Sequence, residues 1–398
     1  MPAVEFTNLL MVAVIALLAP LTLGLAPRLR LPAVVLEIVA GILVGPQVLG
    51  WVEVDLPVSI VALLGLAFLL FLAGLEIDVH QLRGQLLRLA LLGYLVTLVL
   101  GIGVGTALGA VGWVGSPGLV AITLSATSLG LVVPVLKDAG RTESKVGQTV
   151  VAAASVADFT AIVLLSLLFS ASDTSTGSRL VLLVSFAALI AATAVAATLV
   201  SRSTRLTTTL TTLQDTTAQI RVRAAVVLLV AFVALAEQFG LESILGAFMA
   251  GAVVGLVDRD SASHPHFRTK LEAIGYGFLI PVFFVSSGLR LDLSGLMENP
   301  SALARVPVFV VALLVVRGLP ALLFSRFLDH RSVVAAGLLQ ATSLPFVVTA
   351  TQIGVLTGLI SGVTAAALVC AGLLSVVAFP VLALGLLRTP QVAEEGQE

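Results

Sequence analysis

The feature that most constrains this chain is an internal repeat that runs through its whole length. An octet near the first third of the sequence recurs more than two hundred positions later with six of its eight letters kept. Two more pairs follow the same order at nearly the same offset. The pairs are ATSLGLVV at 126–133 with ATSLPFVV at 341–348, GLEIDVHQL at 74–82 with GLRLDLSGL at 288–296, and AGILVG at 40–45 with AGAVVG at 250–255. This pattern predicts two homologous halves, an arrangement typical of secondary transporters when the chain lies in a membrane.

The composition places the chain in a membrane. Hydrophobic residues make up 59% of the 398, charged residues 11%, and the mean hydropathy is +1.14. These values predict a polytopic membrane protein. Cys370 is the sole cysteine, which excludes a disulfide framework within the chain and a multi-cysteine metal site. The net charge of −1 offers no basic face to nucleic acid.

The apolar runs are long enough for thirteen membrane-spanning helices, since a bilayer core needs about 20 apolar helical residues. The predicted spans are 6–26, 31–50, 56–76, 86–111, 117–137, 145–170, 179–201, 218–238, 242–257, 271–288, 303–327, 331–356 and 361–386. We therefore expect an all-α fold.

The positive charges predict the orientation of these spans. Of the 21 Lys and Arg residues, seventeen lie in loops after odd-numbered spans or in the C-terminal tail. Arg179, Arg290 and Arg305 lie on the other side, and Arg317 lies inside span eleven. The positive-inside rule then puts the N-terminus outside and the C-terminus in the cytoplasm. Multi-pass insertion into an inner membrane is the expected localisation.

The repeat pairs join spans that are seven apart, and because seven is odd the two halves are expected to be inverted. The first repeat is predicted over 1–170 and the second over 218–387. A connector helix with a cytoplasmic loop covers 171–217, and a short acidic cytoplasmic tail covers 388–398. No appended soluble domain is expected.

The two ATSL segments put small and hydroxylated residues at mid-span. These residues are Thr127 and Ser128 in the first half and Thr342 and Ser343 in the second. Gly130 and Pro345 follow at equivalent positions and predict breaks in both helices. Crossed broken helices free carbonyl groups and helix ends that can bind a cation. The alternative is that small residues only allow close helix packing, but their duplication favours a binding role.

Asp158 is the clearest charge inside a span, near the centre of span six. A carboxylate at that depth is costly unless it faces water, a cation or a basic partner, so it is the candidate ion and proton site. A protonated or structurally paired aspartate is the alternative. A proton and a metal ion that compete for one carboxylate are sufficient for exchange transport. Arg317 is the expected counter-charge, with a structural ion pair or a snorkelling side chain as alternatives. Glu37 could line a cytoplasmic vestibule or bond a neighbouring helix.

Four segments resemble the Kef-type branch of the monovalent cation:proton antiporters. They are RLPAVVLEIVAGILVGP at 30–46, FLLFLAGLEID at 68–78, SATSLGLVVPVL at 125–136 and LESILGAFMAG at 241–251. The resemblance implies a homodimer in which spans one to three and eight to ten form a scaffold. The other spans of each repeat would form a core that moves like an elevator. It also implies that Asp158 is the ion-binding aspartate and that Arg317 is the family's membrane-embedded basic residue.

One position departs from that family pattern. Its members usually carry Asp, Asn or Gln before the aspartate, whereas this chain has Ala157. A single acid beside a permanently charged base predicts electroneutral exchange of one proton for one Na⁺ or K⁺. An ion-coupled carrier of an organic solute and a non-transporting sensor or paralogue are the other readings. An enzyme is not expected, because the sequence holds no nucleophile with a base, no metal cluster and no phosphate loop, and no cofactor is implied.

Overall fold

The computed structural model describes residues 5–25, 32–76, 84–169, 176–201, 219–257 and 265–387, and every regular element in them is a helix. The acidic tail at 388–398 and most of the predicted loop before residue 218 lie outside the described residues. In chain order the helices are α1 (Thr7–Leu25), α2 (Ala33–Val44), α3 (Leu56–Leu75), α4 (Gly84–Ala110), α5 (Pro117–Ser125), α6 (Leu129–Asp138), α7 (Lys145–Phe169), α8 (Thr176–Ser201), α10 (Ile220–Gln238), α11 (Ser243–Val257), α12 (Pro265–Ile274), η1 (Gly275–Leu279), α13 (Ile280–Leu289), α14 (Leu293–Glu298), α15 (Pro300–Leu313), η2 (Leu314–Gly318), η3 (Leu319–Phe324), α16 (His330–Gln340), α17 (Pro345–Leu356) and α18 (Gly362–Leu387).

Helix occupies each of the predicted spans. When consecutive segments are joined, 7 helices of the described chain are each long and apolar enough to cross a membrane, and shorter apolar helices lie between them. Spans five and twelve are each divided in two, as α5 with α6 and α16 with α17. The predicted all-α, polytopic fold with discontinuous helices is therefore confirmed.

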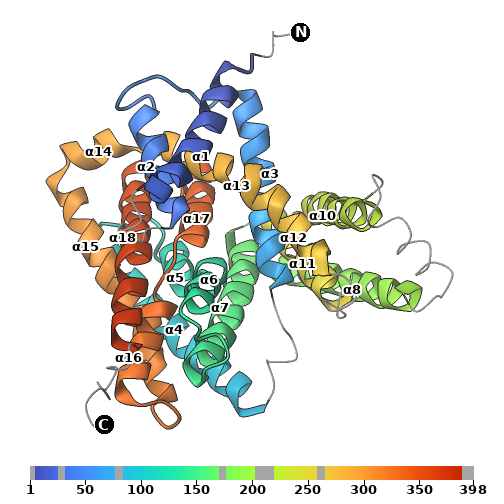
Figure 1. The fold of residues 1–398 in the computed structure, drawn as a ribbon. Helices are drawn as coiled ribbons and strands as arrows, with labels where there is room; N and C mark the ends of the chain where they lie inside the picture. Colours follow the sequence, from blue (N-terminus) through green and yellow to red (C-terminus); the bar gives the residue numbers. More distant parts are fainter. Residues whose placement is uncertain are drawn as a thin grey trace, which may run out of the picture.

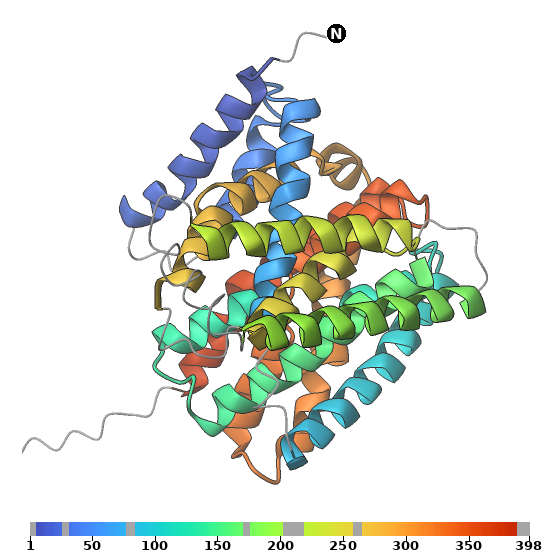
Figure 2. The same cartoon turned by 90° about the vertical axis from the view of Figure 1, so that its right-hand side faces the viewer.

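The helices gather into two bundles. In the scaffold bundle, made of α1–α3 and α10–α13, helices α2 and α3 pack against α13, and α3 also packs against α11. In the core bundle, made of α4–α7 and α15–α18, helix α4 packs against α5 and α7, and α18 packs against α15, α16 and α17. Figure 1 shows the core bundle in cyan, green, orange and red below the blue helices of the scaffold. In Figure 2, α8 and α10 run across the near face, and α11 contacts both of them.

Glycine contacts relate the two repeats inside the scaffold bundle. Gly41 and Gly251 are equivalent residues of the AGILVG and AGAVVG segments, and Gly74 and Gly288 are equivalent residues of the second pair. A methyl group on Gly41 or Gly288 would overlap the backbone of the facing helix, where α2 crosses α13. A methyl group on Gly74 or Gly251 would do the same where α3 crosses α11. The same backbone-to-backbone crossing is therefore built twice, once from each pairing of the repeats.

We expect the Gly251→Ala variant to unfold at a lower temperature than the wild type. Its added methyl group overlaps the backbone of α3, and overpacking of this kind costs about 1–3 kcal/mol. Thermal unfolding in detergent, followed by size-exclusion chromatography, measures the shift. Gly103→Ala is the matched control, because a methyl group at that position in α4 meets open space. Equal unfolding temperatures for the two variants would contradict the close crossing.

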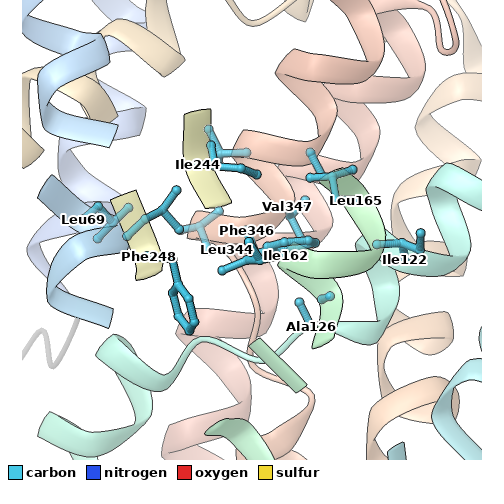
Figure 3. Close-up of a cluster of buried hydrophobic side chains, with 14 of the residues drawn as sticks. Leu69, Ile122, Ala126, Ile162, Leu165, Ile244, Phe248, Leu344, Phe346 and Val347 are labelled. Atoms are coloured by element: carbon cyan, nitrogen blue, oxygen red, sulfur yellow. The ribbon is translucent and has the colours of Figure 1, made fainter. Parts of the chain in front are cut away.

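The two bundles meet along an apolar seam. Figure 3 shows Leu69 and Phe248 of the scaffold on one side, with Ile162 and Phe346 of the core across from them. Among the described residues, the side-chain hydrogen bonds that cross the seam are few. The Glu242 amide donates to Ser166 Oγ at 3.0 Å, and Gln352 Nε2 donates to Ser287 Oγ at 3.1 Å. The core therefore rests against the scaffold mainly through apolar contact.

Candidate functional site

Two non-helical segments interrupt helices at the centre of the core bundle. The first lies between the end of α5 at Ser125 and the start of α6 at Leu129, and the second lies between Gln340 and Pro345. Proline is the first residue of α17, where its missing N–H costs nothing. The breaks thus precede Gly130 and Pro345 rather than fall on them.

The two segments cross and are hydrogen-bonded to each other. The Ser128 amide donates to the Thr342 carbonyl at 3.0 Å, and the Thr127 hydroxyl donates to the Gln340 carbonyl at 2.6 Å. Each segment thereby satisfies part of the other's backbone, which is necessary for irregular structure at membrane depth. The two ATSL motifs therefore converge on one place.

Asp158 lies beside this crossing, near the middle of α7, and is 9% exposed. Its Oδ1 accepts from the Thr127 amide at 3.2 Å, and its Oδ2 accepts from the Leu129 amide at 3.1 Å. Leu129 is the first residue of α6, so the carboxylate caps the positive end of a half-helix. These donors stabilise the charged form of a group that burial alone would disfavour.

Arg317 is buried and is connected to Asp158 through one intervening residue. The two side chains are not bonded directly. Arg317 lies in the π-helical turn η2, and the whole side chain is 1% exposed. Its Nε donates to Thr127 Oγ1 at 2.8 Å and its Nη1 donates to Thr97 Oγ1 at 3.2 Å, while Nη2 has no partner among the described residues. Thr127 therefore stands between the two charges, with its hydroxyl bonded to Arg317 and its amide bonded to Asp158. Arg317 and Asp158 are therefore linked through a threonine rather than by a direct ion pair.

A cavity of about 60 Å³ opens beside Asp158, between the two bundles. The core side of this cavity contributes Thr127, Ser128, the carboxylate and the first turn of α6. The scaffold side contributes mainly apolar groups, which include Leu69 and Phe284. Polar atoms are thus concentrated on one wall.

The remaining predicted residues have different surroundings. Thr342 donates its hydroxyl to the Leu338 carbonyl at 3.1 Å, so its contribution to the crossing is its own carbonyl. Ser343 is fully buried, and its hydroxyl has no partner in the part of the chain that the structure describes. Glu37 is buried on α2 and is not among the residues that line the cavity.

Sequence reasoning missed three residues of this region. Thr97 bonds Arg317, Tyr276 lines the cavity, and Ser375 accepts from the Ser343 amide at 3.2 Å. Ser375 follows the second break at nearly the same distance along the chain as Asp158 follows the first. That repeated spacing could have identified it as the neutral counterpart of the aspartate. No pattern in the sequence marks the other two.

Comparison with known proteins decides the family. The profile of a family described as sodium/hydrogen exchanger, transmembrane, matches residues 13–384. The chain belongs to the sodium/hydrogen exchanger family. Within this exchanger family, it is 30% identical over 407 residues to the putative Na⁺/H⁺ antiporter YjbQ of Bacillus subtilis, covering 98% of this chain and 64% of that relative. The chain thus spans less than two thirds of the length of YjbQ.

Other exchangers match over most of their length. The Na⁺/H⁺ antiporter of Enterococcus hirae is 28% identical over 389 residues, which are 95% of this chain and 97% of that protein. The Na⁺/H⁺-K⁺ antiporter GerN of Bacillus cereus is 29% identical over 300 residues, 73% of this chain and 74% of GerN. The sodium proton antiporter MjNhaP1 of Methanocaldococcus jannaschii has the same fold, with a TM-score of 0.67 at 18% identity and coverage of 95% and 96%.

Proposed function

We propose that this exchanger transports one Na⁺ or K⁺ in one direction for one proton in the other. The observation that carries the proposal is the Asp158 carboxylate, which faces a small cavity and is held by two backbone amides at the crossing of the broken helices. Its relatives bear the names of Na⁺/H⁺ antiporters, and one is named as a Na⁺/H⁺-K⁺ antiporter. The narrower assignment to the Kef-type branch rests on the four segments of the resemblance.

A single carboxylate makes the two substrates mutually exclusive. A proton bound to Asp158 removes the negative charge that attracts the metal ion, and a bound metal ion occupies the oxygen atoms that would take the proton. Arg317 keeps its charge in both cases because a guanidinium does not readily release a proton. The site thus carries the same net charge with either substrate, so exchange is electroneutral.

The apolar scaffold wall makes exchange obligatory. If the core moved with Asp158 ionised and unoccupied, the carboxylate would pass Leu69 and Phe284 with no ion in the cavity and with Arg317 linked to it only through Thr127. A charge in such surroundings is costly, whereas a protonated or cation-bound carboxylate is not. The core bundle moves past the scaffold when Asp158 holds a proton or a cation, and it does not move when Asp158 is unoccupied. This prevents a leak of either ion.

The remaining parts of the proposal describe the movement. The core bundle would carry the site past the scaffold bundle as an elevator, and the scaffold would form a homodimer in the bilayer. If the C-terminus lies in the cytoplasm, Val34 of α2 and Ala73 of α3, which line the cavity, lie near the cytoplasmic ends of their helices. We therefore assign this structure to an inward-facing state. The repeats at 1–170 and 218–387, joined by the connector at 171–217, remain the proposed domain limits.

Cavity size favours this proposal over a carrier of an organic solute. Pockets that enclose drug-sized molecules measure about 300–1,000 Å³, several times the cavity beside Asp158. The non-transporting reading depended on Ala157, which packs in a buried cluster with Ala90 and Tyr94 of α4 and does not line the cavity. A polar side chain at position 157 would not reach a cation in this state. The alanine that stands there therefore leaves the site intact.

Competition predicts how exchange depends on pH. In proteoliposomes with an imposed pH gradient, the apparent KM for Na⁺ should rise about tenfold per unit fall in pH in the acidic range, because protons occupy the carboxylate. Vmax should stay constant, and a membrane potential imposed with a thiocyanate gradient, which adds no transported cation, should leave the Na⁺/H⁺ rate unchanged. A pH-independent KM would contradict competition, and a rate that follows the potential would contradict electroneutrality. No exchange with Na⁺, K⁺ or Li⁺ would overturn the function itself.

A further inference from the structure

We infer that the Tyr276 hydroxyl is the scaffold's ligand for the transported cation in the inward-facing state. This inference rests on the proposed exchange and adds a residue to the same site. Among the described residues that line the cavity, those of the scaffold are apolar except Tyr276. A cation held by core oxygens therefore meets one protein oxygen from the opposite wall.

The position of Tyr276 fits this role. It lies in η1, a π-helical turn between α12 and α13, and such turns often accompany functional sites because they redirect side chains. A methyl group added to Gly130 would lie 3.6 Å from the Tyr276 hydroxyl oxygen, so the phenol reaches the first turn of α6. That turn begins with Leu129, whose amide donates to Asp158.

The hydroxyl is also available. Tyr276 has no hydrogen-bond partner in the described part of the chain and is 45% exposed, whereas Phe284 and Phe346, which also line the cavity, are buried. Tyr276 is thus the most accessible of these three cavity residues. We therefore place its phenol on the path of a cation that enters the cavity.

The role is confined to one side of the membrane. Asp158 and its amide donors belong to the core bundle, whereas Tyr276 belongs to the scaffold bundle. When the core carries the cation to the other side, the carboxylate travels with it and the phenol stays behind. Removal of the hydroxyl should therefore weaken cation binding from the cytoplasmic side and leave binding from the outside unchanged.

The test is the Tyr276→Phe variant, which keeps the ring and loses the oxygen. Everted and right-side-out vesicles from a bacterial strain without antiporters of its own allow Na⁺ to be supplied to either side. The apparent KM for Na⁺ should rise about 3- to 10-fold from the cytoplasmic side and stay within about twofold of the wild type from the outside. Equal shifts on both sides, or none, would overturn the inference.

Tyr94→Phe is the matched control. Tyr94 is the only other tyrosine, and its hydroxyl is hydrogen-bonded to Ser125 at 3.0 Å inside the core bundle, away from the cavity. Its loss should affect both sides equally. If the wild type itself shows no exchange, the proposed function fails. If the wild type exchanges but Tyr276→Phe lacks sidedness, the assignment of Tyr276 alone fails.

A second measurement is independent of transport. In a Tyr94→Phe variant in which Trp51 and Trp113 are also replaced by phenylalanine, Tyr276 is the sole tyrosine and no indole absorbs, so the ultraviolet difference spectrum reports on the phenol. Addition of NaCl, but not of choline chloride, should perturb the spectrum in a saturable way that acid suppresses. An unperturbed spectrum at Na⁺ concentrations that saturate transport would refute a contact between the cation and Tyr276.

Discussion

We expect the Asp158→Asn variant to exchange cations for protons at least about 100-fold more slowly than the wild type, in line with the loss of an essential acid or base. The amide cannot bind a proton or neutralise a cation. It also has one acceptor oxygen where the carboxylate uses two to bond the Thr127 and Leu129 amides. Dequenching of a pH-sensitive dye in proteoliposomes measures the rate. Exchange at the wild-type rate would remove Asp158 from the mechanism.

A matched control comes from the surface of the protein. Asp329 is exposed and caps α16 by accepting from the Ser332 amide. Hydrogen bonds from Ser332 hold the pKa of its carboxyl below the usual range, so it is ionised throughout the assay. Asparagine caps helices as well as aspartate does, so Asp329→Asn removes the same charge without loss of the cap. Wild-type exchange by this variant shows that the position of the carboxylate matters and not the total charge.

The second large effect is expected at Arg317. Arg317→Met should lower exchange severely, because it removes the donor that fixes Thr127 and the positive charge near the site. A hydrogen bond to a charged group contributes about 1.5–3 kcal/mol, so a double-mutant cycle of Arg317→Met with Thr127→Val should give a coupling energy of that size. Unfolding of the purified protein in detergent supplies the four stabilities.

Thr97 provides the comparison for this cycle. Its bond to Arg317 is longer, at 3.2 Å against 2.8 Å, and among the described residues it has no hydrogen bond to Asp158 or to the second break. Thr97→Val should therefore couple to Arg317 in stability but spare much of the exchange rate. Additive effects of the Arg317 and Thr127 substitutions would contradict the link through Thr127.

Much of the architecture could be predicted from the sequence, because hydrophobic run lengths and the repeat depend on local composition. Asp158 stood out for a related reason, since a charge is conspicuous in an apolar span. The contact between Arg317 and Thr127 could not be predicted. A π-helical turn changes the direction in which Arg317 points, and ordinary helical spacing does not reveal such a turn.

The breaks show the same limit. Gly130 and Pro345 indicated where the helices are interrupted, but the hydrogen bonds between the two crossing segments determine which residues leave the helical conformation. Tyr276 carried no signal, because an isolated tyrosine in an apolar helix is ordinary. Its position opposite the carboxylate depends on the packing of two bundles that are distant in sequence.

The seam between the bundles has a consequence for the speed of the cycle. Among the described residues, few side-chain hydrogen bonds join the two bundles. They include the bonds of Ser166 and Gln352. In the proposed elevator movement, the core would exchange one apolar surface for another and would break few hydrogen bonds. The main resistance to that movement would then be the shape of bulky side chains such as Phe346. Substitution of these bulky side chains by smaller ones should change the turnover rate, while the affinity for ions stays the same.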